Sequence, residues 1–174
     1  VDAGLDESLQ SILVTMAEGF AVSELALGFA LDGSDLADDV LFIQSEMEAL
    51  ALLLSRENLF RSEPEELPEI QRRLESLGQR IESLQVDWEA MRPLFPLLES
   101  QKLADGDAVT EALSAAGQVV EAAQSLLSGL QLLLSSAAHG LLTDGFGETM
   151  GAVLIDWRDQ SQLALDALAP LTGA

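Results

Sequence analysis

The sequence predicts an all-α protein, an elongated up-and-down antiparallel bundle of four long helices plus a fifth helical segment. Its clearest sign is a run of ten apolar residues at alternating spacings of three and four, which only an α-helix brings onto one face. The chain is also 48% apolar but only 5% aromatic, so the core must be aliphatic. The apolar run consists of Leu67, Ile70, Leu74, Leu77, Ile81, Leu84, Trp88, Met91, Phe95 and Leu98.

We expect a single helical-bundle domain over residues 1–174, because this length suffices for one sizeable core. The segments between the apolar runs are short, so consecutive helices should be antiparallel. The expected helices cover about 5–31, 35–60, 65–101, 107–138 and 147–169.

Turn signals set the expected helix boundaries. Asp32-Gly33-Ser34 should end the first helix, since Gly tolerates a left-handed cap and Ser can cap the next helix. Pro93 and Pro96 each remove an amide donor, so the third helix should kink near Met91. Glycines should loosen the chain between the last two helices, at Gly140, Gly145 and Gly147.

The chain is strongly acidic, with 30 Asp and Glu against eight Lys and Arg and a net charge of −22. Such a surface repels phosphate backbones and anionic lipid, which excludes nucleic acid as a partner. Residues 1–55 contain eleven acids and no base. We attribute the acidic cluster that follows the expected first helix to capping of the second: Asp32, Asp35, Asp38 and Asp39.

No segment of the sequence is expected to cross a membrane. The uncharged run 122–143 is long enough, but Gln124, Ser128, Gln131 and Ser135 form a polar stripe typical of an amphipathic bundle helix. The sequence begins at Val1, without an initiator Met or a signal peptide, which indicates a fragment or a processed product. A membrane is therefore expected only through flanking segments outside this sequence.

Nothing in the sequence predicts an enzyme, a metal site or a cofactor. There is no Cys and only one His, so the sequence lacks the residues that a catalytic triad or a common zinc or haem site requires. His139 admits one alternative, a histidine phosphotransfer domain. The Lys and Gly expected after such a histidine are replaced here by Leu142 and Thr143.

Two groups of residues are candidates for binding. Trp88 and Arg92 lie one helical turn apart before the prolines and could form a pocket for a small anionic ligand. Alternatively, Trp88 is a core residue and Arg92 pairs with a nearby acid. Met16, Phe20 and Leu27 belong to a broad apolar face of the first helix, which predicts a homodimer contact.

The helix order resembles the PilJ-type sensor domain of type IV pilus methyl-accepting chemoreceptors over residues 5–138. The family's Gln-Arg-rich motif is missing, since residues 14–20 contain no Arg, so its small-anion site cannot be transferred to this chain. The resemblance is carried by Ala30-Leu31-Asp32-Gly33, by Leu84-x-x-x-Trp88-x-x-x-Arg92 and by Glu99-Ser100-Gln101.

This resemblance implies an extracytoplasmic (periplasmic) sensing bundle of a bacterial transmembrane signalling receptor, a chemoreceptor or sensor kinase that takes part in signal transduction such as chemotaxis. It would be a homodimer, bind a small molecule or a protein partner, and signal by helix displacement. The alternative is a cytoplasmic scaffold or adaptor bundle whose apolar first helix binds a partner helix.

Overall fold

The computed structural model describes residues 2–54, 66–138 and 146–172. They form helices only, which confirms the all-α prediction. The elements are α1 (Asp2–Leu54), α2 (Glu66–Met91), the short 3-10 helix η1 (Arg92–Leu94), α3 (Phe95–Ser100), α4 (Gly106–Ala138) and α5 (Phe146–Thr172).

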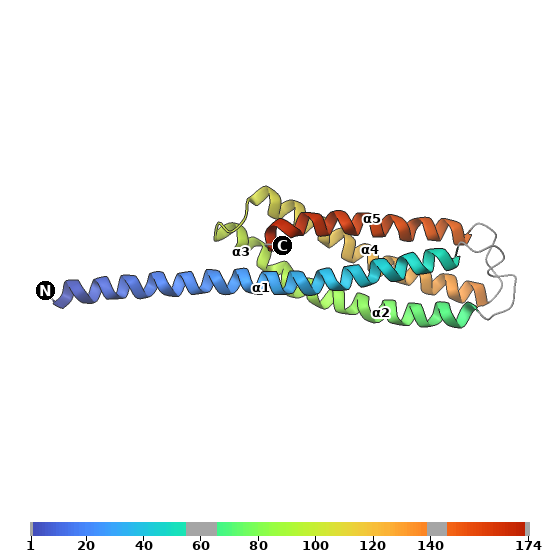
Figure 1. The fold of residues 1–174 in the computed structure, drawn as a ribbon, viewed down its shortest axis with the longest axis horizontal. Helices are drawn as coiled ribbons and strands as arrows, with labels where there is room; N and C mark the ends of the chain where they lie inside the picture. The colour runs from blue at the N-terminus through green and yellow to red at the C-terminus, as the bar shows by residue number, and fades with distance from the viewer. Residues whose placement is uncertain (1, 55–65, 139–145, 173–174) are drawn as a thin grey trace.

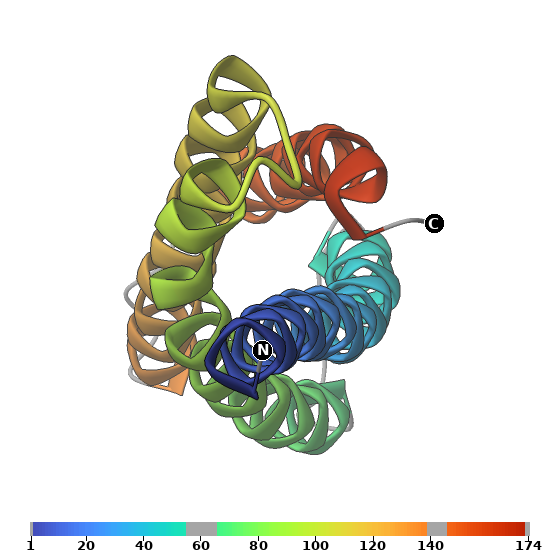
Figure 2. The same cartoon turned by 90° about the vertical axis from the view of Figure 1, so that its left-hand side faces the viewer.

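The four long helices α1, α2, α4 and α5 pack antiparallel around one core (Figure 1). Viewed along the bundle, α1 contacts α2 and α5, and α4 contacts the same two helices from the opposite side (Figure 2). Because the direction alternates, α5 ends at the end of the bundle from which the N-terminal half of α1 projects.

The apolar run that predicted the fold is buried, as expected. From Ile70 to Leu98, every member of the run is at most 5% exposed. The corresponding positions of α4 and α5 complete the core, with the C-terminal half of α1 packed against them. The main contributions of these three helices are Leu36, Val40, Ile43, Met47, Leu50, Val109, Ala116, Val120, Ala123, Leu130, Leu154, Trp157 and Leu168.

The predicted break at residues 32–34 is wrong, because α1 runs through it as one continuous helix. A Cβ at Gly33 would lie only 2.5 Å from Thr172 Cγ2 and 3.3 Å from Met91 Cε, so the missing side chain makes room for the ends of α5 and α2. Phe29 and Leu36 are buried on either side. This packing outweighs the cost of about 1 kcal/mol for a helical Gly. The expected helix 5–31 and the described part of the expected helix 35–60, up to Leu54, are a single element, and residues 55–60 lie outside the described residues.

The predicted kink near Met91 is confirmed. α2 ends at Met91, η1 carries Pro93, and α3 resumes at Phe95, so the expected helix 65–101 is three consecutive pieces. Met91 and Phe95 are both fully buried, which keeps the apolar run continuous across the kink. Lys102 then adopts a left-handed conformation (φ 59°), and the turn leads into α4.

The last two expected helices agree with α4 and α5 to within a few residues, and α5 is a full member of the bundle. Gly147 was expected in the connection but lies inside α5, where it is buried. A Cβ at this position would overlap the carbonyl oxygen of Leu54, and one at Gly151 would lie 3.4 Å from the carbonyl oxygen of Ala51. These glycines therefore let α5 approach the backbone of α1. Gly140 and Gly145 lie outside the described residues.

Candidate functional site

The N-terminal half of α1 projects from the bundle (Figure 1). We call residues 2–28 the arm. Residues 7–21 are all exposed, and Leu25 is partly buried and packs against the core where the arm meets the bundle. The predicted interaction face lies on the arm, with Met16 51%, Phe20 65% and Leu27 62% exposed. More than half of each of these side chains is therefore exposed in the described part of the chain, and the homodimer contact stays a prediction.

By length and composition alone, α1 from Glu7 to Leu54 could cross a membrane, a test that a core helix or a signal sequence also passes. The expectation that no segment of this sequence crosses a membrane therefore stays a prediction. Only 6% of the apolar window that meets this test is buried within the bundle, so the window is not an ordinary core helix. Large apolar side chains occur on several sides of the arm. They include Leu9, Ile12, Leu13, Val14, Met16, Phe20 and Leu27.

At 1.5 Å per residue, the 27 residues of the arm extend about 40 Å, against a hydrocarbon thickness of about 30 Å. The uncharged run 122–143, considered from the sequence, falls partly in α4. The described part of α4 packs in the bundle through Ala123, Leu130 and Leu133.

Three aromatic side chains close the bundle where the arm leaves it, and we call this end the neck. The Phe95 ring lies 5.0 Å from Phe29 and 5.6 Å from Trp88, both in edge-to-face geometry. Phe29 is fully buried and is the first such residue of α1. Phe29 therefore joins the end of the arm to the core aromatics of α2 and α3.

Trp88 and Arg92 differ in burial and in the groups that they contact. Trp88 is 5% exposed, in the aromatic contacts of the neck. The Arg92 side chain is 56% exposed and pairs with Glu89 at 3.0 Å, in an i,i+3 pair on the surface. The structure thus favours the alternative in which Trp88 is a core residue and Arg92 pairs with a nearby acid.

The acidic cluster does not cap a helix, because it lies inside α1. Asp39 is 3% exposed and faces α2, where Arg80 Nη1 donates to its Oδ1 at 3.1 Å. The Ser83 hydroxyl donates to its Oδ2 at 3.1 Å. The Arg80 guanidinium also lies 4.3 Å from the centre of the Phe42 ring. These contacts fix the register of α1 against α2.

Asp87 lies one turn beyond Ser83 on α2, close to the acidic cluster of α1. Burial raises its pKa from 3.8 to about 7, with further contributions from a hydrogen bond with Asp39 and from the charges of Asp39, Asp35 and Asp32. The raised pKa of Asp87 could not be predicted from the sequence, because it depends on the contact between α1 and α2. Near neutral pH, protonation of Asp87 changes the charge between α1 and α2.

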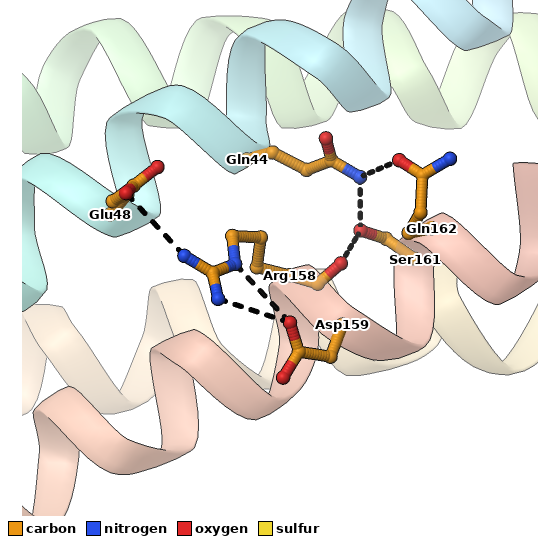
Figure 3. Close-up of polar contacts among 6 residues, drawn as sticks. All are labelled: Gln44, Glu48, Arg158, Asp159, Ser161 and Gln162. Atoms are coloured by element: carbon orange, nitrogen blue, oxygen red, sulfur yellow. Dashed lines mark hydrogen bonds and ion pairs between the residues drawn. The ribbon is translucent and has the colours of Figure 1, made fainter.

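A second polar layer joins α1 to α5 (Figure 3). Gln44 Nε2 donates to the Ser161 hydroxyl at 2.8 Å, and this hydroxyl donates to the carbonyl oxygen of Arg158 at 2.7 Å. The Arg158 guanidinium lies 3.4 Å from Glu48 and 3.2 Å from Asp159. Since Ser161 is fully buried, this layer fixes the register of α5 against α1.

Comparisons with protein-family models, with curated proteins and with solved structures find no match for the chain. The resemblance to the PilJ-type sensor domain therefore stays a prediction from the pattern of helices. Within the part of the chain that the structure describes, no group of three or more His, Cys, Asp or Glu is placed to hold a metal ion. His139 lies outside that part.

Proposed function

We propose that the chain is an extracytoplasmic sensing bundle of a bacterial transmembrane signalling receptor, and that the arm anchors it in the membrane. One observation carries this proposal. A single helix, α1, is both an exposed apolar arm and a core helix of the bundle. Such a helix connects a sensing domain to a membrane without a flexible linker.

The distribution of charge is compatible with the bundle lying outside the membrane. The first base of the sequence is Arg56, and cytoplasmic flanks of membrane helices are enriched in Lys and Arg. The flank of the arm that leads into the bundle has no Lys or Arg within this distance. The N-terminal flank, with Asp2, Asp6 and Glu7, has none either, so the orientation rests on the proposed sensing role and not on charge.

The two polar layers limit how a signal would travel. A shift of α1 by a full helical turn, about 5.4 Å, would break its contacts with Arg80 and Ser161 together. Shifts of about 1–2 Å are typical of packed helices and would only strain them. We infer that the signal is a small displacement of α1, carried from the neck into the arm.

Glu18 and Glu24 favour a second candidate, a scaffold whose arm binds a partner helix. Both side chains are exposed on the arm, and carboxylates are costly in hydrocarbon unless they are protonated or paired. In an aqueous complex they would stay in water while Met16, Phe20 and Leu27 pack on the partner. Membrane binding therefore decides between the two functions.

We expect the full chain to co-float with phosphatidylcholine vesicles, which carry no net charge that would repel the acidic bundle. The double substitution Met16→Asp and Phe20→Asp, in the middle part of the arm, should abolish flotation, since a charge near a membrane centre costs about 2.5–3.5 kcal/mol. The matched control is Val86→Asp with Leu132→Asp, at two exposed apolar positions of the bundle. A wild-type chain that stays in the aqueous fraction contradicts the membrane anchor and favours the scaffold.

The homodimer is tested separately by analytical ultracentrifugation in detergent micelles. We expect a weak dimer for the wild-type chain and a shift toward monomer for Phe20→Asp, because this residue is at the centre of the exposed face. Leu132→Asp should leave the equilibrium unchanged. A strict monomer at high protein concentration would remove the dimer from the proposal but leave the anchor.

A further inference from the structure

A groove of about 540 Å³ runs along the outer side of the bundle between α4 and α5. This volume is within the range of about 300–1,000 Å³ typical of small-molecule sites. Val119 and Leu126 of α4 and Val153 and Leu163 of α5 form much of its lining. Leu163 is 61% exposed and Val153 44%, so part of this apolar surface faces water.

Small residues on α4 explain why the groove is open. Ala115, Ala122 and Ser125 lie along it and leave space that longer side chains would fill. Its base is held by Trp157, which is 3% exposed and whose indole N–H donates to the carbonyl oxygen of Val119 at 3.0 Å. The groove therefore has a firm aromatic base and does not depend on a mobile loop.

The charged groups of the groove are all acidic. Glu111 and Asp156 are its charged lining residues, and Gln118 and Gln160 add amide groups. The nearest base along α5, Arg158, lies against Glu48 of α1 on another side of the helix (Figure 3). Together with the net charge of −22, this lining repels anions and attracts cations.

We propose that the α4–α5 groove binds a small organic cation with an apolar body, of the arylalkyl-ammonium class. The aryl or alkyl part would lie on Val119, Val153 and Leu163, and the ammonium group would lie near Asp156. This inference rests on the proposed sensing function and supplies its ligand class.

The position of the groove connects it to the arm. Trp157 belongs to the groove, while Arg158 and Ser161, which follow it on α5, contact Glu48 and Gln44 of α1. A ligand that rotates or separates α5 from α4 by a small amount therefore acts on the polar layer between α5 and α1. Since α1 continues into the arm, this polar layer connects α5, which lines the groove, to the helix that forms the arm.

The test is isothermal titration of the full chain in non-ionic detergent micelles with 3-phenylpropyl-trimethylammonium, with protein-free micelles as the blank. We expect saturable binding with a Kd of about 0.1–1 mM, from the size of the probe. Tetramethylammonium lacks the apolar body and 4-phenylbutyrate carries the opposite charge, so neither should saturate. If tetramethylammonium bound equally well, the net negative charge of the chain would explain the binding without a groove, and the proposal would be overturned.

Substitutions then locate the bound probe. Ala122→Phe fills the groove from an exposed position and should weaken binding at least about tenfold, or about 1.4 kcal/mol. Asp156→Asn should weaken it about threefold, in the range of an exposed charge pair. Asp166→Asn is the matched control, because it removes the same charge from α5 outside the groove lining.

Binding that none of the groove substitutions changes would overturn the proposal. So would a dimer that Ala122→Phe dissociates, which would place a second copy of the chain in the groove. Neither result depends on the vesicle experiment, since flotation reports the arm and titration reports α4 and α5. A failure of the ligand site is therefore distinguishable from a failure of the membrane anchor.

Discussion

Gly147→Ala should destabilise the bundle by about 2–3 kcal/mol, because the new Cβ would overlap the Leu54 carbonyl oxygen of α1. The obstacle is backbone rather than a movable side chain, so α5 must shift away from α1 to relieve it. Ala is a better helix former than Gly by up to about 1 kcal/mol, and the expected loss is net of this gain. For a chain of this length it corresponds to a fall in Tm of about 4–12 °C.

Two other glycines provide matched controls for this experiment. A Cβ at Gly78 of α2 would lie 3.7 Å from Leu127, an ordinary contact, and one at Gly19 of the arm would meet nothing within 4 Å. Both Ala variants should therefore equal or exceed the wild-type stability in thermal unfolding followed by circular dichroism. If Gly147→Ala behaved like them, the close contact between α5 and α1 would be wrong.

The core of this fold was predictable because burial requires a repeating pattern. A helix packed on two neighbours has to place apolar residues every three to four positions, and from Ile70 to Leu98 nothing interrupts that spacing. The kink at Pro93 was predictable for the same local reason, since a missing amide donor acts whatever the surroundings. These features depend on the chain's own backbone and not on which element lies beside it.

The course of α1 was not predictable in this way. Asp32-Gly33-Ser34 has the composition of a turn, but a helix stop is a weak local preference that packing can outweigh. Here the ends of α2 and α5 lie against Gly33, through Met91 and Thr172. The spacing of Met16, Phe20 and Leu27 likewise resembles that of a core helix, so the sequence alone could not show that these residues leave the bundle.

The candidate sites depend on pairs of helices, which limits what one sequence can show. The interaction face was predicted from its apolar surface; its three residues are more than half exposed, and the dimer contact itself stays a prediction. By contrast, the groove between α4 and α5 depends on Ala122 of one helix facing Val153 of another, and no spacing within either helix indicates it. Asp39 was predicted to cap a helix, but it lies inside α1 and accepts hydrogen bonds from Arg80 and Ser83 of α2.

The second large effect is expected at Asp87, as a dependence of stability on pH. Its pKa is raised to about 7 in the folded chain from 3.8, so the folded state binds this proton more tightly than the unfolded state. The resulting stabilisation is complete below about pH 4 and is lost as the pH rises through about 7. Above that pH the carboxylate faces Asp39, Asp35 and Asp32 across the contact between α1 and α2.

Asp87→Asn removes the charge at every pH and should therefore stabilise the bundle at pH 8 by about 2–3 kcal/mol, with little effect at pH 4. The rise in the pKa of Asp87 corresponds to about 4 kcal/mol. Partial exposure of this side chain to water reduces the effect on stability. Glu82→Gln is the control, since it removes one negative charge from an exposed position of the same helix. Urea unfolding of the three proteins at pH 4, 6 and 8 separates this effect from the general repulsion within an acidic chain. If both variants showed the same pH dependence, the contact between Asp87 and Asp39 would have no part in it.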